Sequence, residues 1–328
     1  MQTIYSAVLT PAPALFYRRE RWDTPDNDFI DLDWMDGDPA GPLFVLFHGL
    51  EGSSASHYAR SLMAHVRARG HTGLVVHFRG CGGEMNRLPR SYHSGDSAEI
   101  DWIMRRLRSA RPHARIFVSG VSLGGNALLK WLGEQGDAAC QIVNGAAAIS
   151  APMDLRASGL NLGRGFNMLY TKMFLATMKK KGQDKLSQFP TLFDGEAMHR
   201  ARNLYEFDNV VTAPLHGYRD TDDYWSRGSA KPVMPHITVP TLVVNALNDP
   251  FIPPASLPRG AEVSRHVHLE YPATGGHVGF VARPFPGDLD WLPRRLLHHF
   301  DGVHSAAYAA QKIFVPATAE QPVITLST

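Results

Sequence analysis

The sequence has few cysteines, little net charge and no long hydrophobic run. Its two cysteines, Cys81 and Cys140, are too few for a disulfide framework. The 33 basic and 31 acidic residues leave a formal net charge of +2, and no basic block dominates the chain. This balance argues against nucleic acid as a partner. No apolar run approaches the length of a transmembrane helix.

The apolar stretch "IYSAVLTPAPALF" near the N-terminus is not typical of a targeting segment. No lysine or arginine precedes it, and two prolines interrupt it. It therefore fits neither a signal peptide nor a membrane anchor. We expect a cytoplasmic protein whose contact with membranes is at most peripheral. Hydrophobic residues make up 44% of the chain and charged residues 20%, which is ordinary globular composition.

Strand-like and helical patterns alternate from about residue 40. Strand-like runs are predicted at 42–47, 73–78, 115–119, 142–150, 240–247 and 265–272. Amphipathic helical runs lie between the first four and again near the end of the chain. This alternation predicts an α/β fold with a mostly parallel central sheet flanked by helices.

One segment breaks the rhythm, because residues 155–236 carry no convincing strand pattern. We interpret it as a helical cap insertion over the C-terminal edge of the sheet. The prediction is thus one domain over residues 1–303, followed by a tail over 304–328 that is rich in Ala, Thr and Pro.

The stretch "IFVSGVSLGGNALLKWL" places Ser122 between a strand and a helix. Such a sharp bend pushes its central residue out above the sheet, beside the N-terminus of a helix. Gly120 and Gly124 remove the side chains that would clash across the bend. A serine in this position suits a nucleophile, because its oxygen is exposed and free N–H groups lie nearby.

A serine nucleophile needs a base and an acid that orients the base. His277, in the glycine-rich loop "TGGHVGF" after the last predicted strand, is the best-placed histidine. Asp249, in "NALNDPFIP", follows the preceding strand. Two alternatives stay open at this point: Asp249 is an ordinary turn residue, or Asp154 is the acid in its place. The order Ser, Asp, His favours Asp249, because it is the order of α/β hydrolases.

The loop "FHGLEG" follows the first predicted strand and suits an oxyanion hole. We expect the backbone N–H groups of Leu50 and Leu123 to form it, although a plain β-turn would give the same pattern. His48 is expected to brace this loop. No histidine pair has convincing metal spacing with a carboxylate, so we predict no metal and no cofactor.

Several blocks resemble the α/β-hydrolase superfamily, and more narrowly its YheT-like esterase branch. They are "FHGLEGSSASHYARSL", "HFRGCGGEMNRLPRSYHSGD", "GVSLGGNALLKWLGE", "TAPLHGYRDTDDYWSRGSA", "PTLVVNALNDPF" and "GGHVGF". The resemblance implies nucleophile, acid and base at Ser122, Asp249 and His277. It also implies a carboxylesterase acting on small-molecule acyl esters. Arg79 and His93, in the second block, are expected to hold loops near the site.

The resulting hypothesis is a serine carboxylic-ester hydrolase that acts on short- to medium-chain acyl esters. An acyltransferase with an alcohol acceptor would use the same acyl-enzyme and stays open, as does a non-catalytic binding protein on this scaffold. In "FNMLYTKMFLATM", Met173 and Phe174 fall on a broad apolar stripe, which either packs the insertion onto the domain or roofs the substrate pocket. The lysines at 179–181, directly after it, suit either contact with an anionic head group or membrane surface, or a solvated helix end, and we expect the solvated helix end.

Overall fold

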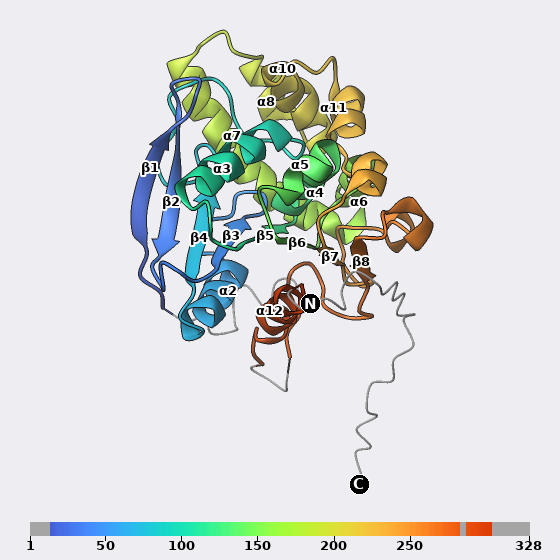
Figure 1. Cartoon of the computed structure of the whole chain (residues 1–328). Helices are drawn as coiled ribbons and strands as arrows, with labels where there is room; N and C mark the ends of the chain where they lie inside the picture. The colour runs from blue at the N-terminus through green and yellow to red at the C-terminus, as the bar shows by residue number, and fades with distance from the viewer. Residues whose placement is uncertain (1–13, 283–286, 304–328) are drawn as a thin grey trace.

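The computed structural model describes residues 14–282 and 287–303. The sequence predictions for the N-terminal stretch (1–13) and for the tail from residue 304 lie outside these residues. Eight strands form one sheet in the order β1-β2-β4-β3-β5-β6-β7-β8. All pairs from β4 to β8 are parallel, whereas β2 is antiparallel to both β1 and β4. The mostly parallel sheet agrees with the prediction (Figure 1).

The strands are β1 (Arg18–Asp23), β2 (Phe29–Met35), β3 (Leu43–Phe47), β4 (Thr72–His77), β5 (Ile116–Val121), β6 (Gly145–Ile149), β7 (Thr241–Val244) and β8 (Val267–Glu270). The six predicted strands are all present, and most ends differ by one or two residues. The predicted run 142–150 is too long, because β6 begins only at Gly145 after a short turn.

The first two strands were not predicted, because charged residues interrupt the continuous apolar runs that mark the other strands. Arg19 lies directly opposite Asp33, and Arg21 lies directly opposite Asp31. Each arginine Nε donates to its partner's carboxylate, at 2.7 and 2.8 Å. Both aspartates are buried. Pairing across the strands therefore offsets the cost of burying these carboxylates, which a single strand's sequence cannot reveal.

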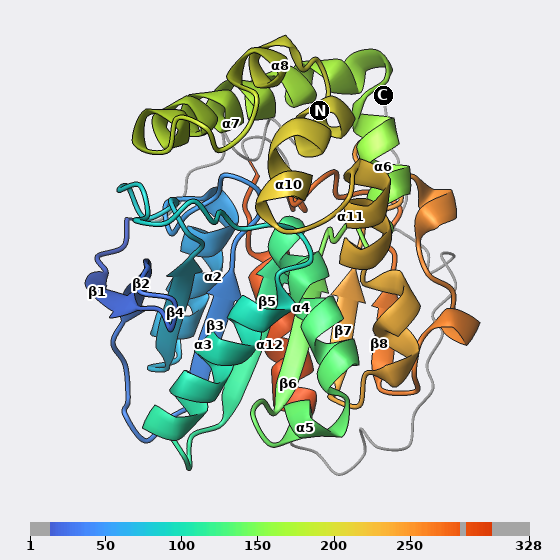
Figure 2. The ribbon, with the colours of Figure 1, turned by 90° about the horizontal axis from the view of Figure 1, so that it is seen from above.

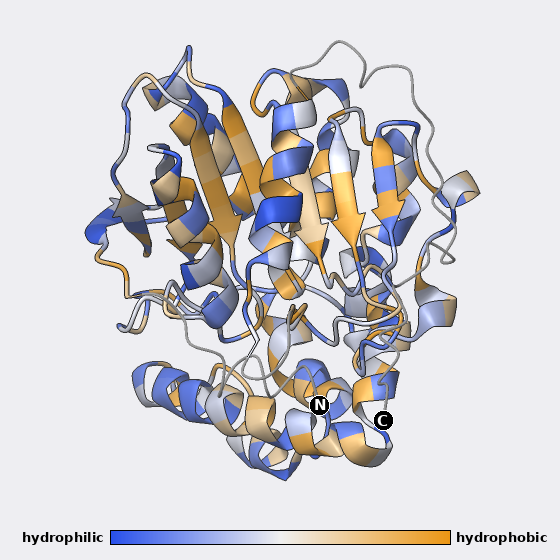
Figure 3. Ribbon diagram, turned by 90° about the horizontal axis from the view of Figure 1, so that it is seen from below, coloured by the Kyte–Doolittle hydropathy of each residue, from blue (hydrophilic) through white to orange (hydrophobic). Residues whose placement is uncertain are grey.

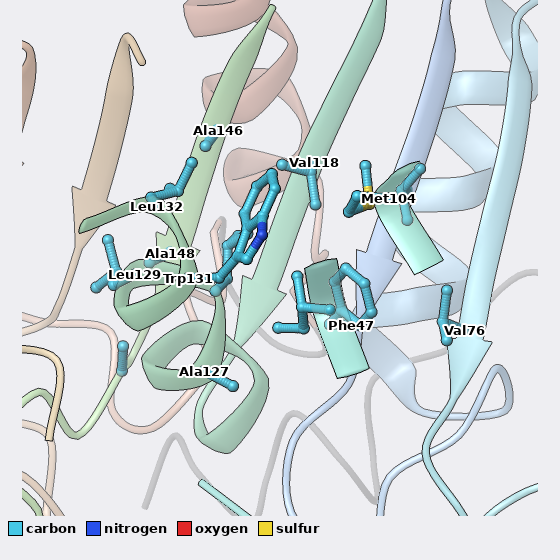
Figure 4. Close-up of a cluster of buried hydrophobic side chains, with 14 of the residues drawn as sticks. Phe47, Val76, Met104, Val118, Ala127, Leu129, Trp131, Leu132, Ala146 and Ala148 are labelled. Carbon is cyan, nitrogen blue, oxygen red and sulfur yellow. The ribbon is translucent and has the colours of Figure 1, made fainter. Parts of the chain in front are cut away.

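Helices cover both faces of the sheet, as buried parallel strands require. The outer helices are α2 (His57–Ala68), α3 (Ser97–Ala110), α4 (Leu123–Gln135), α5 (Asp137–Cys140) and α12 (Trp291–Gly302). Alternate side chains of β3 pack on opposite faces of the sheet. Val45 and Phe47 pack with α3 and α4, whereas Phe44 and Leu46 pack with α2 and α12. Figure 3 shows the central strands as the most apolar part of the fold. Figure 4 shows Trp131 of α4 among the buried side chains on the face of the sheet that α3 and α4 cover.

The segment between β6 and β7 contains helices and, within these described residues, no strand. Its elements are α6 (Leu155–Leu162), η1 (Gly165–Asn167), α7 (Met168–Gln188), α8 (Gly195–Arg200), α9 (Leu204–Phe207), the π-helix η2 (Asp208–Thr212), α10 (Ala213–Leu215), α11 (Thr221–Gly228) and η3 (Lys231–His236). Short 3₁₀ turns η4 (Pro254–Ser256) and η5 (Gly260–Glu262) follow β7. Helices α6 to α11, which we call the cap, lie beyond the C-terminal ends of the strands (Figure 2).

Candidate active site

Ser122 lies at the turn between β5 and α4, in a strained backbone conformation. Its φ is 52° and its ψ is −119°, a region that side-chain-bearing residues rarely adopt. The Ser122 N–H donates to the carbonyl of Ile149 at 2.8 Å, which ties the turn to β6. The strain is therefore held by the surrounding sheet.

Two glycines make this turn sterically possible. A Cβ at Gly120 would lie 2.4 Å from the carbonyl oxygen of Gly124. A Cβ at Gly124 would lie 2.5 Å from the carbonyl oxygen of His48. Real Cβ atoms do not approach other atoms so closely, so both positions need glycine. Gly124 also brings α4 against the loop after β3.

The structure brings Ser122, His277 and Asp249 together from three separate loops. His277 Nε2 lies 2.9 Å from Ser122 Oγ, and His277 Nδ1 lies 2.8 Å from Asp249 Oδ2. A carboxylate only accepts hydrogen bonds, so Nδ1 carries the proton and Nε2 is free to accept from the serine hydroxyl. The rival acid, Asp154, instead caps α6 by accepting from the Ala157 N–H at 2.9 Å.

The loop that carries His277 is held in place by a residue that the sequence reasoning missed. Asn248 Oδ1 accepts from the N–H groups of Gly275 and Gly276, at 3.0 and 2.8 Å. Asn248 directly precedes Asp249, so the loops that carry Asp249 and His277 are joined beside the contact between these two side chains. The ring of Phe251 packs on the His277 ring, with centroids 4.3 Å apart. These contacts restrict the orientation of the imidazole.

The backbone N–H groups on both sides of Leu50 donate hydrogen bonds within the protein. Gly49 N–H donates to the Tyr58 hydroxyl at 3.0 Å, and Glu51 N–H donates to the Tyr92 hydroxyl at 2.9 Å. Within residues 14–282 and 287–303, the Leu50 N–H has no acceptor. Leu123 is the first residue of α4, so its N–H has no intrahelical acceptor either. Both N–H groups predicted for the oxyanion hole are thus available to a ligand.

His48 braces the loop, as predicted. The Phe78 N–H donates to His48 Nε2 at 3.1 Å, so Nε2 is the unprotonated nitrogen. Nδ1 then carries the proton and donates to the carbonyl of Gly49 at 2.7 Å. Burial lowers the pKa of His48 to about 3, which keeps the ring neutral. Both ring nitrogens are used inside the protein, so His48 is not placed for proton transfer.

Glu51 connects this loop to the cap. It is one of the few non-glycine residues with a positive φ, 55°. Its carboxylate accepts from the Tyr92 hydroxyl at 2.8 Å and from Nζ of Lys181 in α7 at 2.9 Å. The expectation that Lys181 belongs to a solvated helix end is wrong, because α7 continues to Gln188 and Lys181 is turned toward the domain beneath it.

The loop over residues 78–96, for which the sequence indicates no chemistry, is organised by buried ion pairs. Arg79 donates to Glu99 at 2.6 Å, to Asp26 at 2.8 Å and to Asp28 at 3.1 Å. Asn86 Nδ2 donates to the same Asp28 at 2.6 Å. Arg79 therefore has the structural role that we expected. His93 is likewise buried, and its Nδ1 accepts from the Gly95 N–H at 3.2 Å.

A cavity of about 90 Å³ opens between Ser122 and the cap. Its lining includes Leu50, Leu123 and His277, together with a mainly apolar set: Pro152, Leu155, Leu162, Phe174, Leu204, Tyr224, Trp225, Phe251 and Ile252. Phe174 thus lines the cavity. This agrees with the interpretation that part of the apolar stripe of α7 roofs the pocket. Met173 does not line it and is 62% exposed. Adjacent helical residues point about 100° apart, and in α7 it is Phe174 that faces the cavity.

One acidic side chain lines the same cavity. Asp208, in η2, accepts from Trp225 Nε1 at 2.9 Å and from Thr212 Oγ1 at 2.6 Å. Burial raises its pKa to about 6, and the two hydrogen bonds only partly offset this. The described residues place no cationic side chain within ion-pair distance of Asp208.

The fold and these contacts define the class of protein. A family model described as "alpha/beta hydrolase fold" matches residues 42–284. The chain therefore belongs to the α/β-hydrolase family, and the prediction from the sequence is confirmed. Within the described residues, no helix combines the length and the apolar character that crossing a bilayer requires.

Particular relatives narrow this assignment to the YheT-like branch. The chain is 36% identical over 299 residues to the Escherichia coli (strain K12) protein named "Putative esterase YheT", covering 88% of this chain and 87% of that protein. It is 29% identical over 303 residues to mouse Phospholipase ABHD3, covering 89% of this chain and 73% of the relative. The solved esterase Pf2001 of Pyrococcus furiosus shares the fold, with a TM-score of 0.59 at 17% identity, covering 91% of this chain and 98% of that one.

Proposed function

We propose that this protein is a serine carboxylic-ester hydrolase that works through an acyl-enzyme on Ser122. The observation that carries the proposal is the continuous contact from Ser122 Oγ through His277 to Asp249, at 2.9 and 2.8 Å. The class agrees with the names of the relatives, which include an esterase and a phospholipase. The mostly apolar cavity beside Ser122 supports an acyl ester of short to medium chain length as the substrate.

The geometry suits the first half of the reaction. His277 Nε2 takes the proton of Ser122 as Oγ attacks the ester carbonyl, because an unassisted serine hydroxyl is a weak nucleophile. Asp249 holds the required tautomer and stabilises the imidazolium that forms. The N–H groups of Leu50 and Leu123 stabilise the negative charge that develops on the carbonyl oxygen.

The later steps use the same groups. As the tetrahedral intermediate collapses, His277 gives its proton to the leaving alcohol, and the departure of this alcohol leaves the acyl group on Ser122 Oγ. Water then enters and attacks the acyl carbonyl while His277 removes its proton. His277 returns this proton to Ser122 Oγ as the second tetrahedral intermediate collapses, which releases the carboxylic acid and restores the serine. Every proton transfer in this sequence thus passes through the one imidazole that contacts Ser122.

Two measurements test this proposal. A fluorophosphonate probe should label the wild-type protein at Ser122, and it should not label Ser122→Ala. The wild-type protein should also hydrolyse a p-nitrophenyl ester series from acetate to palmitate, with its highest kcat/KM among the short and medium chains. Failure of the folded wild-type protein both to react with the probe and to turn over any of these esters would refute the proposal.

A further inference from the structure

A second cavity lies under the cap and shares Leu50 with the cavity over Ser122. Its volume is about 80 Å³, similar to that of the first. A water molecule needs only about 10–15 Å³ on this measure, so the space holds more than one small group. Much of the lining is apolar: Leu50, Met85, Tyr92, Met178, Phe193, Phe207, Val211 and Leu215.

The charged side chains of this second cavity are mostly positive. Arg79, Lys181 and Lys185 line it, against one carboxylate, Glu51. Arg79 already contacts three carboxylates, and Lys181 is paired with Glu51. These two cations are therefore compensated inside the protein.

Lys185 differs from the other two cations. It is only 3% exposed, and its Nζ donates to the backbone carbonyls of Asn86, at 3.0 Å, and of Leu88. Within the described ranges, no carboxylate lies within ion-pair distance of Lys185. An ammonium group has three N–H donors, so one remains beyond the two carbonyl contacts. Burial lowers the pKa of Lys185 to about 8, which leaves it mainly charged at neutral pH.

His216 lines the same cavity and also has an unused polar atom. Its Nε2 is buried and has no hydrogen-bond partner in the part of the chain that the structure describes. Its ring packs on His93, with centroids 4.3 Å apart. Burial lowers the pKa of His216 to about 3, so the ring is neutral and can present an N–H donor. Buried polar groups normally have a hydrogen-bond partner, so this ring nitrogen is open to a ligand in the cavity.

We propose that this second cavity binds an anionic group of the ester substrate, a phosphate or a carboxylate, with Lys185 as its counter-ion and His216 as a second donor. The apolar lining would contact the hydrocarbon that joins this group to the ester. The inference rests on the proposed function, because it takes Leu50, which borders both cavities, to lie beside the ester carbonyl.

Binding to the Ser122→Ala protein tests the site without any turnover. Octyl phosphate, octanoate and octanol share one chain and differ in the head group, and calorimetry gives the affinity of each. We expect at least one anion to bind tenfold or more tightly than octanol, since hydrogen bonds to charged groups are the strong ones. The anion that binds more tightly identifies the group. Equal affinity for all three ligands would overturn the proposal.

Lysine variants in the same background locate the site. Lys185→Met should weaken binding of the preferred anion about tenfold and leave octanol binding within about twofold. Lys180→Met is the matched control, because Lys180 belongs to the same helix, α7, and does not line the cavity. An equal loss of affinity in both variants would contradict the assignment to Lys185.

A cavity-filling variant covers the case in which Lys185→Met does not fold. Leu215→Trp should reduce anion binding by occupying the cavity from α10, and unchanged anion affinity in this variant would refute the location.

Fluorophosphonate labelling of the wild-type protein separates the proposed hydrolase function from the proposed anion site. If the wild-type protein does not react with the probe, the proposed hydrolase function is refuted. Anion binding is measured on Ser122→Ala and does not depend on that result.

Discussion

Lys181 of α7 forms an ion pair with Glu51, the residue directly after Leu50, with Nζ 2.9 Å from the carboxylate. The cap is thereby connected to the loop that carries a proposed oxyanion donor. We expect Lys181→Met to lower kcat for p-nitrophenyl acetate about fivefold, which corresponds to about 1 kcal/mol of transition-state stabilisation. KM should change little, because an oxyanion donor acts mainly in the transition state.

Two comparisons check that this effect passes through Glu51. Lys180→Met, on the same helix, should leave kcat unchanged. The double variant Glu51→Gln/Lys181→Met should be no slower than the slower single variant, because the two residues form one contact. Additive losses, or a change confined to KM, would contradict a positioning role for Lys181.

Removing the proposed nucleophile should abolish activity without affecting the fold. Ser122→Ala and His277→Ala should each lower kcat by at least about 10³-fold, because the three residues act as a unit. Asp249→Asn should cost as much or less, through loss of the correct imidazole tautomer. Ester turnover gives the rates, and thermal unfolding confirms that each variant is folded. Wild-type turnover by Ser122→Ala would exclude the mechanism.

Gly124 should tolerate no side chain. A Cβ there would lie 2.5 Å from the carbonyl oxygen of His48, so Gly124→Ala must shift either α4 or the loop after β3. We expect a loss of about 3 kcal/mol in the free energy of unfolding, at the upper end of overpacking effects. Gly260→Ala is the control, because a Cβ at Gly260 would meet no atom within 4 Å. Denaturant unfolding of both variants measures the difference, and similar stabilities would show that the contact is easily relieved.

Phe174 should influence the preferred acyl chain. If it borders the acyl position, Phe174→Trp should lower kcat/KM for octanoate esters about tenfold relative to acetate esters. That factor corresponds to two lost methylene contacts at about 0.8 kcal/mol each. Met173→Trp is the matched control, since Met173 is 62% exposed. The p-nitrophenyl series measures both variants. Equal effects of Phe174→Trp on acetate and octanoate would place the acyl chain elsewhere.

Asp208 should make stability depend on pH. Its pKa is about 6 in the native state against an ordinary value of 3.8, so the native state binds more protons between these pH values. This contribution to stability is therefore present at low pH and is lost as pH rises through 6. Relative to wild type, Asp208→Asn should become more stable by up to about 3 kcal/mol between pH 4 and pH 7.5. Denaturant unfolding at both pH values checks this, and a pH-independent difference would contradict it.

Much of the fold could be predicted, because parallel strands buried on both faces are continuously apolar. The runs around β3, β4 and β5 are of this kind, and all their residues are buried. Strands β1 and β2 could not be predicted in this way. Their Arg19–Asp33 and Arg21–Asp31 pairs become compatible with a sheet only when the two strands lie in register.

The candidate site shows the same division. Local sequence was enough to place Ser122 at a strand-to-helix bend, and chain order was enough to select Asp249 and His277. The supporting residues carried no local signal. Glu51, Tyr92 and Lys181 are far apart in the sequence, and their contact exists only once the cap lies over the sheet.

The sequence by itself determined the class of fold and the three residues of the proposed triad, because apolar periodicity and glycine-flanked turns act over short distances. Only the tertiary structure decided which side chains meet beneath the cap. Helical periodicity predicts an apolar stripe on α7, but tertiary packing determines which of its residues are covered. Phe174 faces the cavity and Met173 faces solvent. Among the described residues, packing likewise left Lys185 buried with no carboxylate within ion-pair distance, because desolvation and pairing depend on distant segments of the chain.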